Sequence, residues 1–341
     1  MKRRILLAGL AGAVAARSGL AVAQSAPLSV APSQNDNTLG IIAGGLDGTY
    51  IRFADDLAAV LDGIDGLRLL PIIGKGSMQN LADLLGLQRV DLAFVQSDVL
   101  AAAAQQRLFS GLQQEVQYIA KLYDEEVHIF ARAGVKSLAD LAGKRVNMES
   151  RSSGTAMTTN FLLSRFGIAV QPVYVPSNDA TELLRKGELD ALVRIAGKPT
   201  RFSAPLPEGT HLLPIPLNEM LMETYSPATL TAEDYPALIP AGGSVETVAV
   251  GAVLACYNHQ SAARRDRLQR FSRALTLKFD SFLQPPRHPK WRDVNLTASL
   301  PGWTRFGQPL PASTPPAQSR PRNRSGQRLR RPFPSPERTE E

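Results

Sequence analysis

The sequence predicts an α/β protein built of two lobes, and three observations point to this fold class. First, short apolar runs alternate with segments of helical period from residue 41 onward, which is typical of a parallel sheet joined by right-handed crossovers. Second, the extended segment 118–131 carries charges in its middle and is expected to cross into a second lobe. Third, another alternating set follows, and a strand at 245–256 is expected to return the chain to the first lobe.

The first unit of the pattern is the stretch 41–50, IIAGGLDGTY, in which an apolar run ends in glycines, a threonine and a tyrosine. A helix is expected next, because Phe53, Leu57 and Leu61 fall on one face, with Asp56 largely off it. A helix start leaves backbone amides unpaired and carries a partial positive charge. Strand, glycine turn and helix start therefore form a place where an anion can bind.

The remaining elements are predicted from the same periodicities. Ser137–Asp140 reads as a capping-box helix start with Gly143 as its C-cap, and the proline-rich stretch 205–240 stays unassigned apart from one strand. The expected strands are 67–73, 91–95, 145–148, 173–175, 189–195, 211–215 and 245–256, and the expected helices begin near 78, 98, 156, 179 and 261. The expected divisions are a signal peptide 1–23, lobe 1 at 38–122, lobe 2 at 123–244, a return to lobe 1 with C-terminal helices at 245–303, and a disordered basic Pro/Arg-rich tail 304–341.

The N-terminus has the pattern of an export signal. Lys2, Arg3 and Arg4 precede an apolar core, and Ala21-Val22-Ala23 supplies a cleavage site; whether export uses the general or the twin-arginine route stays open. No cysteine stands at the cleavage site to carry a lipid. Cys256 is the only cysteine, which excludes an intramolecular disulfide, and its apolar surroundings predict an inert, buried strand residue.

The net charge of +7 comes from the two ends of the chain. From Arg287 onward there are eleven Lys or Arg against four Asp or Glu, and the first 23 residues add four basic residues, so residues 24–286 sum to −4. A nucleic-acid footprint needs basic residues clustered on the domain itself, so nucleic acid is not an expected partner.

Four loops that each follow a predicted strand carry small hydroxyl or amide residues. Alone, each reads as an ordinary turn or helix cap. Together they indicate a cleft, because ligands of open parallel sheets bind beyond the carboxyl ends of the strands. Amides and hydroxyls there can hold a carboxylate without carrying charge themselves. The loops are Gly48-Thr49-Tyr50, Gly76-Ser77, Gln96-Ser97 and Ser152-Ser153-Gly154-Thr155.

Other candidates are weaker or ambiguous. Gly74-Lys75-Gly76-Ser77 does not fit a phosphate loop, the four histidines show no metal-ligand spacing, and no G-x-S-x-G elbow is present. Arg194 either grips an acidic ligand bidentately or pairs with Asp190 or Glu188. Tyr50 either covers the ligand or belongs to the core.

Several motifs together resemble the TAXI family of TRAP-transporter solute receptors. They are GGLDGTY, GKGSMQNL and DLAFVQSD in the first lobe and SLADLAGKRV, SSGT and GELDA in the second, within residues 39–291. The resemblance implies a type II periplasmic binding-protein fold with a central ligand cleft and hinge. The binding positions it implies are Gly48, Thr49, Tyr50, Ser77, Gln96, Ser97, Ser153, Gly154 and Thr155. Arg194, the stretch 205–240 and the tail depart from the family pattern.

The expected function is therefore a periplasmic receptor, without cofactor or metal, that captures a small carboxylated solute and delivers it to a TRAP-type membrane permease. The implied ligands are organic acids and acidic or related amino acids, and the receptor is expected to be a monomer and not an enzyme. Three alternatives stay open. They are an ABC-type binding protein, a sensory receptor, and an exported hydrolase or isomerase that uses Ser77 or Ser153 as nucleophile.

Overall fold

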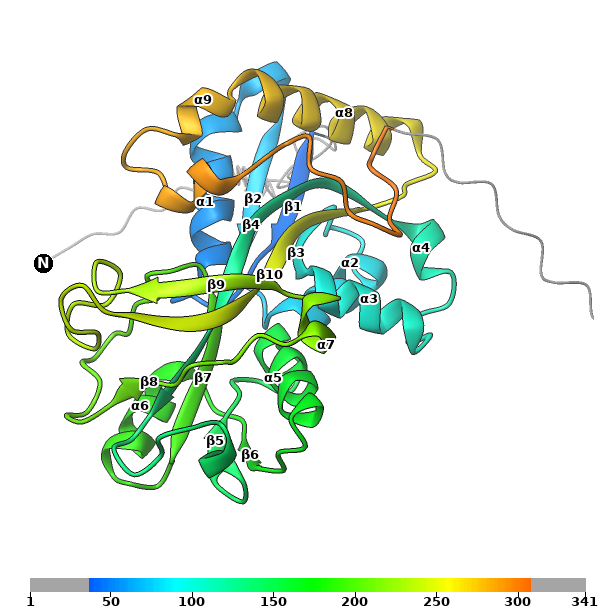
Figure 1. The fold of residues 1–341 in the computed structure, drawn as a ribbon. Helices are drawn as coiled ribbons and strands as arrows, with labels where there is room; N and C mark the ends of the chain where they lie inside the picture. Colours follow the sequence, from blue (N-terminus) through cyan, green and yellow to red (C-terminus); the bar gives the residue numbers. More distant parts are fainter. Residues whose placement is uncertain (1–36, 308–341) are drawn as a thin grey trace, which may run out of the picture. The chain divides into compact units, whose positions relative to one another are not determined.

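A computed structural model describes residues 37–307, which form one mixed ten-stranded sheet flanked by helices (Figure 1). The main strand order is β2-β1-β3-β10-β4-β7-β5-β6, with β8 beside β4 and β9 beside β10. Within the described residues, no helix is both long and apolar enough to cross a membrane. The expected signal peptide 1–23 and the tail from 308 onward lie outside the described residues.

Lobe 1 begins with three parallel strand–helix units, as the sequence predicts. Strands β1 and β2 pair in parallel, and β1 also pairs in parallel with β3. The elements are β1 Thr38–Ile42, α1 Thr49–Leu61, β2 Arg68–Ile72, α2 Ser77–Gly86, β3 Leu92–Gln96, α3 Ser97–Gln105 and α4 Leu112–Glu115.

Two long antiparallel strands join the lobes. β4 (Val116–Ala131) and β10 (Ser244–Tyr257) pair with each other along much of their length. β10 also pairs with β3 of lobe 1 and with β9 of lobe 2, while β4 continues beside β7 of lobe 2. The strands expected at 118–131 and 245–256 are thus confirmed.

Lobe 2 repeats the parallel pattern on the far ends of these strands, where β5 pairs in parallel with both β6 and β7. The α/β fold of two lobes expected from the sequence is confirmed by this topology. The elements are β5 Arg145–Asn147, α5 Gly154–Arg165, β6 Gln171–Val173, α6 Ser177–Arg185, β7 Ala191–Ala196, β8 His211–Leu212, α7 Glu219–Met222 and β9 Ser226–Thr231.

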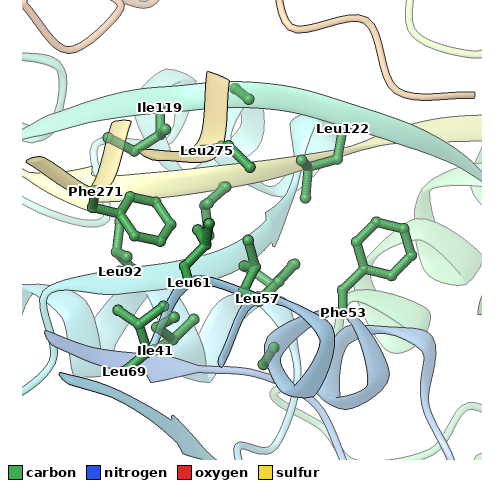
Figure 2. Packing of buried hydrophobic residues seen from close by; sticks show 14 of the residues in the cluster. Ile41, Phe53, Leu57, Leu61, Leu69, Leu92, Ile119, Leu122, Phe271 and Leu275 are labelled. Atoms are coloured by element: carbon green, nitrogen blue, oxygen red, sulfur yellow. The ribbon is translucent and has the colours of Figure 1, made fainter. Parts of the chain in front are cut away.

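The C-terminal segment returns to cover lobe 1. It comprises α8 (Ala262–Leu277), α9 (Phe279–Phe282) and the 3₁₀ helix η4 (Pro289–Asp293). In Figure 2, Phe271 and Leu275 of α8 lie in one buried cluster with Leu57 and Leu61 of α1. Apolar burial of this kind contributes roughly 25 cal/mol per Å², so the C-terminal helices stabilise the sheet that carries the first strands.

Some local expectations differ from the structure. The Asp140 carboxylate accepts from the Ser137 amide as a capping box requires, and Gly143 has the positive φ of a C-cap, but the helix between them is only a one-turn 3₁₀ helix, Ala139–Leu141. The expected helix at 261–282 is interrupted at Lys278. The unassigned stretch 205–240 contains α7 and β9.

Two further residues depart from their expected places. Asp56 is buried, because it accepts hydrogen bonds from the His288 amide at 2.8 Å and from the Trp291 indole at 2.9 Å, both distant in sequence. Thr304, placed in the expected tail, accepts a hydrogen bond from the Tyr118 amide of β4. Cys256 is fully buried in β10, as expected, and burial raises the pKa of its thiol.

Candidate ligand-binding cleft

A cleft of about 440 Å³ lies between the two lobes. Lobe 1 lines it with the loops after β1 and β2 and the end of β3, and lobe 2 lines it with the loops after β5 and β6 and the end of β7. The joining strand β4 contributes Glu125. The structure therefore brings together residues from both lobes that the sequence singled out separately. Those on the lining are Gly48, Thr49, Tyr50, Ser77, Gln96, Ser153, Gly154, Thr155 and Arg194.

Four helices begin at this cleft. The first residues of α1, α2, α5 and α6, namely Thr49, Ser77, Gly154 and Ser177, all lie on its lining. Each helix start presents unpaired amides and the positive end of its dipole. The cleft can therefore hold an anionic group without a free cationic side chain.

The lobe 1 wall is organised around the Ser77 hydroxyl. Ser77 donates to Gln96 Oε1 at 3.3 Å and accepts from the Gln96 amide at 3.1 Å. The Tyr50 hydroxyl lies 3.5 Å from Ser77 Oγ and donates to Glu125 Oε2 at 2.5 Å. Tyr50 is buried and stacks on Phe94, so it belongs to the core with its ring and to the cleft with its hydroxyl.

The lobe 2 wall approaches this network closely at the start of α5. Ser153 is the N-cap, and its hydroxyl accepts from the Ala156 amide at 3.0 Å. Gly154 follows, and a Cβ placed on it would lie 1.4 Å from Gln96 Oε1 and 2.8 Å from Ser77 Oγ. A side chain at this point would force Gln96 to move or the lobes to separate, so glycine fits best here.

Ser97 does not line the cleft, unlike its neighbour Gln96. It is the first residue of α3, and its hydroxyl lies 3.4 Å from the place where a Cβ on Gly251 of β10 would stand. Gln96 ends β3 and Ser97 begins α3, and this change of backbone direction points their side chains to different sides. Spacing along the sequence alone does not reveal the difference.

Arg194 lies on the lining, but its guanidinium is already engaged by the protein. It donates to the Arg201 carbonyl at 2.6 Å and to the Asp47 carbonyl at 3.2 Å, and its Nε lies 3.8 Å from Glu149 Oε1. Neither expected partner is correct, because Asp190 instead pairs with Arg132 at 3.2 Å and Glu188 has no ion pair with Arg194 among the described residues. Arg194 of lobe 2 is thus hydrogen-bonded to the backbone of the Asp47 loop of lobe 1.

Two carboxylates on the cleft lining, Glu125 and Glu149, were not predicted from the sequence. Glu149 accepts from Thr155 Oγ1 at 2.9 Å and from Ser177 Oγ at 3.0 Å. Glu125 lies in the middle of β4 and is 3% exposed. A signal for Glu125 was present in the sequence, since three consecutive acids, Asp124 to Glu126, interrupt a largely apolar strand, and buried acids are rare without a partner.

The lobes also meet beside the cleft, where α5 lies next to α3 (Figure 1). Asp98 of α3 accepts from Thr158 Oγ1 at 2.6 Å and from the Tyr225 hydroxyl at 2.9 Å, both in lobe 2. Burial raises the pKa of Asp98, and these two hydrogen bonds oppose the rise. The contact between lobes therefore contains a buried carboxyl whose pKa lies above that of an ordinary aspartate.

Asp98 should make the stability of the folded state depend on pH. Because its folded pKa is raised, its contribution is fully present below the ordinary aspartate pKa and is lost as the pH rises through the raised value. We expect the unfolding free energy of the wild type, relative to Asp98→Asn, to fall with rising pH by up to about 1.4 kcal/mol per unit within that window. Urea unfolding of both proteins from pH 4 to pH 8 measures this, and parallel curves would contradict it.

None of the four histidines of the chain lies on the cleft lining. Within residues 37–307, no cluster of three or more His, Cys, Asp or Glu has a metal-binding arrangement. The lining thus offers hydroxyls, amides and carboxylates, together with Lys75 and the engaged Arg194. These groups are suited to holding a polar small molecule.

Comparison with known proteins gives one family match and several structural likenesses. The pattern of the NMT1-like family matches residues 41–264. The alkanesulfonate-binding protein SsuA from Xanthomonas axonopodis pv. citri, bound to MOPS, is 15% identical with a TM-score of 0.44 over 74% of this chain and 76% of its own. An ancestral arginine-binding protein bound to arginine is 13% identical with a TM-score of 0.41 over 72% and 93%. YhfZ from Shigella flexneri is 16% identical with a TM-score of 0.43 over 74% and 94%.

Proposed function

This chain belongs to the NMT1-like family, and from the cleft between its lobes we propose that it is an exported solute receptor, not an enzyme. It captures a small carboxylate-containing solute, an organic acid or an acidic or related amino acid. It then delivers the solute to a TRAP-type membrane permease, acting as a monomer in the periplasm.

The observation that carries this proposal is the convergence of four helix starts on one cleft. Amides and hydroxyls from both lobes face the same space, so a carboxylate bound there is neutralised by groups that are not themselves charged. Such a ligand contacts both lobes only while they are together. It therefore stabilises the closed arrangement and shifts the equilibrium toward it.

Binding without turnover agrees with the state of the two serines that could act as nucleophiles. Ser153 donates to the Ser150 carbonyl at 2.7 Å, and Ser77 donates to Gln96, while no histidine lines the cleft to activate either. A thermal-shift screen of organic acids and amino acids on the purified protein tests the proposal, because a ligand of the folded state raises the melting temperature. Conversion of any stabilising ligand into a product would overturn it.

Delivery to a TRAP permease rests on the motifs of the two lobes. Its test is the genetic neighbourhood and a transport assay. A TRAP permease gene beside this one, and solute uptake that requires both proteins, would support the assignment. An ATPase partner or a membrane kinase in that place would favour an ABC-type or sensory receptor instead.

Removing one hydroxyl donor from either wall should weaken binding. Ser77→Ala and Thr155→Ala are each expected to weaken binding of the ligand found in the screen by ~1–3 kcal/mol, the usual cost of losing a donor to a charged group. Each hydroxyl can turn from its protein acceptor, Gln96 for Ser77 and Glu149 for Thr155, to the carboxylate of the ligand. Titration calorimetry measures the change. Ser164→Ala, which removes an exposed hydroxyl from the other end of α5, is the matched control and should bind as the wild type does. Unchanged affinity in both cleft variants would contradict the assignment.

A further inference from the structure

We infer that Glu125 makes the cleft selective for carboxylates that also carry a protonated amine, because its free oxygen accepts the ammonium group of the ligand. This inference rests on the proposed function and narrows the ligand class to zwitterions such as α-amino acids. It follows from the position of Glu125, from the way the other charges of the cleft are paired, and from the link between Glu125 and the anion-binding wall.

Glu125 is held in the cleft by one oxygen only. Its Oε2 accepts the Tyr50 hydroxyl at 2.5 Å, whereas its Oε1 has no donor among residues 37–307. The side chain belongs to the cleft lining although the residue is 3% exposed. Glu125 Oε1 is not among the described side-chain atoms that are buried without a partner, so it is open to the cleft, where a cationic group of a ligand can donate to it.

The other acidic groups of the lining already have partners. Glu149 accepts from Thr155 and Ser177 and lies beside Arg194. Asp47 is exposed and accepts from Asn178 at 3.3 Å. Glu125 is the buried acid of this lining for which the described residues supply no cation within ion-pair distance.

The nearest buried cation serves the neighbouring residue instead. Lys290 Nζ lies 2.6 Å from Glu126 Oε1, and this pair is almost fully buried on the side of β4 that faces η4. Successive side chains of a strand point to opposite faces. Lys290 is therefore engaged with Glu126 and also bonds the Asp124 carbonyl at 3.1 Å, so it is not the ion-pair partner of Glu125.

Glu125 also lies next to the groups that would hold the carboxylate of the ligand. The Tyr50 hydroxyl links the two, since it donates to Glu125 and lies 3.5 Å from Ser77 Oγ at the start of α2. An anion site and an acid are thus placed on either side of one hydroxyl. This matches an α-amino acid, in which carboxylate and ammonium are attached to the same carbon.

The protonation of Glu125 gives the inference a second, independent signature. Burial raises the pKa of Glu125 well above its usual range; the Tyr50 hydrogen bond lowers it, nearby Glu126 and Asp98 raise it, and Lys290 lowers it. Because of this raised pKa, Glu125 keeps its proton to a higher pH than an ordinary glutamate does, whereas a ligand ammonium favours the ionised carboxylate. Binding of an amine-bearing ligand should therefore release a proton. The titratable and charged groups around this site are Tyr50 on α1, Asp98 on α3, Tyr123 and Glu126 on β4, Arg194 on β7 and Lys290 on η4.

The experiment compares matched probes on the full-length protein by calorimetry and thermal shift. Each set holds an amino acid, the corresponding 2-hydroxy acid and the deaminated acid, for example glutamate, 2-hydroxyglutarate and glutarate, and the sets cover the common amino acids. We expect an amino acid to bind roughly 10-fold to 100-fold more tightly than its hydroxy and deaminated analogues, the usual range for a hydrogen bond to a charged group.

Two variants distinguish a specific role of Glu125 from the general effect of removing one negative charge. In Glu125→Gln, the ratio of the affinity for an amino acid to the affinity for its analogues should fall close to one. Proton release on binding, measured in two buffers of different ionisation enthalpy, should be abolished. Glutamine has the shape of the protonated acid, so the variant should fold, and its melting temperature checks this. Glu246→Gln, which removes an exposed acid from β10, is the control and should keep both the preference and the proton release.

The outcomes are distinct. Plain acids that bind as tightly as the amino acids would overturn the inference and leave the carboxylate receptor standing. Glu125→Gln with an undiminished preference for the amine would also overturn it. Absence of binding by every probe would overturn both proposals together. If Glu125→Gln does not fold, the analogue series and the proton release of the wild type decide.

Discussion

Trp291→Ala is expected to lower the free energy of unfolding by about 3–5 kcal/mol, the usual cost of deleting a large buried aromatic side chain. Trp291 is fully buried, and its ring lies 4.3 Å from that of Phe53 on α1 and 4.2 Å from that of Phe282 on α9. It thereby joins the C-terminal segment to the helix that follows the first strand. Its indole also donates to Asp56, so its loss leaves a buried carboxylate with one donor fewer.

Urea unfolding measures the effect, and Trp291→Phe separates its two parts. Phenylalanine keeps most of the stacking but not the indole N–H, so we expect it to cost only about 1–2 kcal/mol. Trp303 offers a second comparison, because it is only partly buried and its replacement by alanine should cost less than that of Trp291. Equal losses for the two tryptophans would show that the stack around Trp291 is not the main contact of the C-terminal segment.

Gly154→Ala is expected to weaken ligand binding on the order of 100-fold while leaving each lobe folded. The added Cβ would stand 1.4 Å from Gln96 Oε1, so either Gln96 moves off its bonds with Ser77 or the lobes stay apart. Overpacking of this kind costs ~1–3 kcal/mol or more. Here that cost falls on the contact between the lobes and therefore on the closed arrangement.

Gly86→Ala is the matched control, since it adds the same methyl group to α2 at a place where nothing lies within 4 Å. We expect this variant to keep the affinity of the wild type. Calorimetry with the ligand from the screen gives the affinities, and melting temperatures without ligand show whether folding is retained. Gly154→Ala with wild-type affinity would mean that the walls do not meet at this point when the ligand is bound.

The sequence predicted those parts of the fold that repeat with a period. The alternating units, the crossing near 118–131 and the return at 245–256 were all found, because sheet and helix each impose their own spacing on apolar residues. Helix length was less predictable than helix starts. The Asp140 carboxylate bonds the Ser137 amide as a helix cap does, but the sequence pattern did not reveal that the helix beside it is only one turn long.

For the cleft, the sequence predicted the residues that stand directly at helix starts, such as Thr49, Ser77 and Gly154. It missed Glu125 and Glu149, because their roles depend on partners from other elements. Glu125 bonds Tyr50 from a position 75 residues away, and Glu149 bonds Ser177 from a position 28 residues away. Distant pairings of this kind follow from the folded arrangement and not from spacing along the chain.

The pairing of β4 with β10 also constrains the order in which the molecule can be assembled. One edge of β3 pairs with β10, and β10 begins at Ser244, after the whole of the second lobe. A chain emerging from the ribosome or from a translocation pore therefore presents the opening strands long before their sheet can be completed. Until that last long strand arrives, the edges of β3 and β4 remain open to chaperones, or to pairing with another copy.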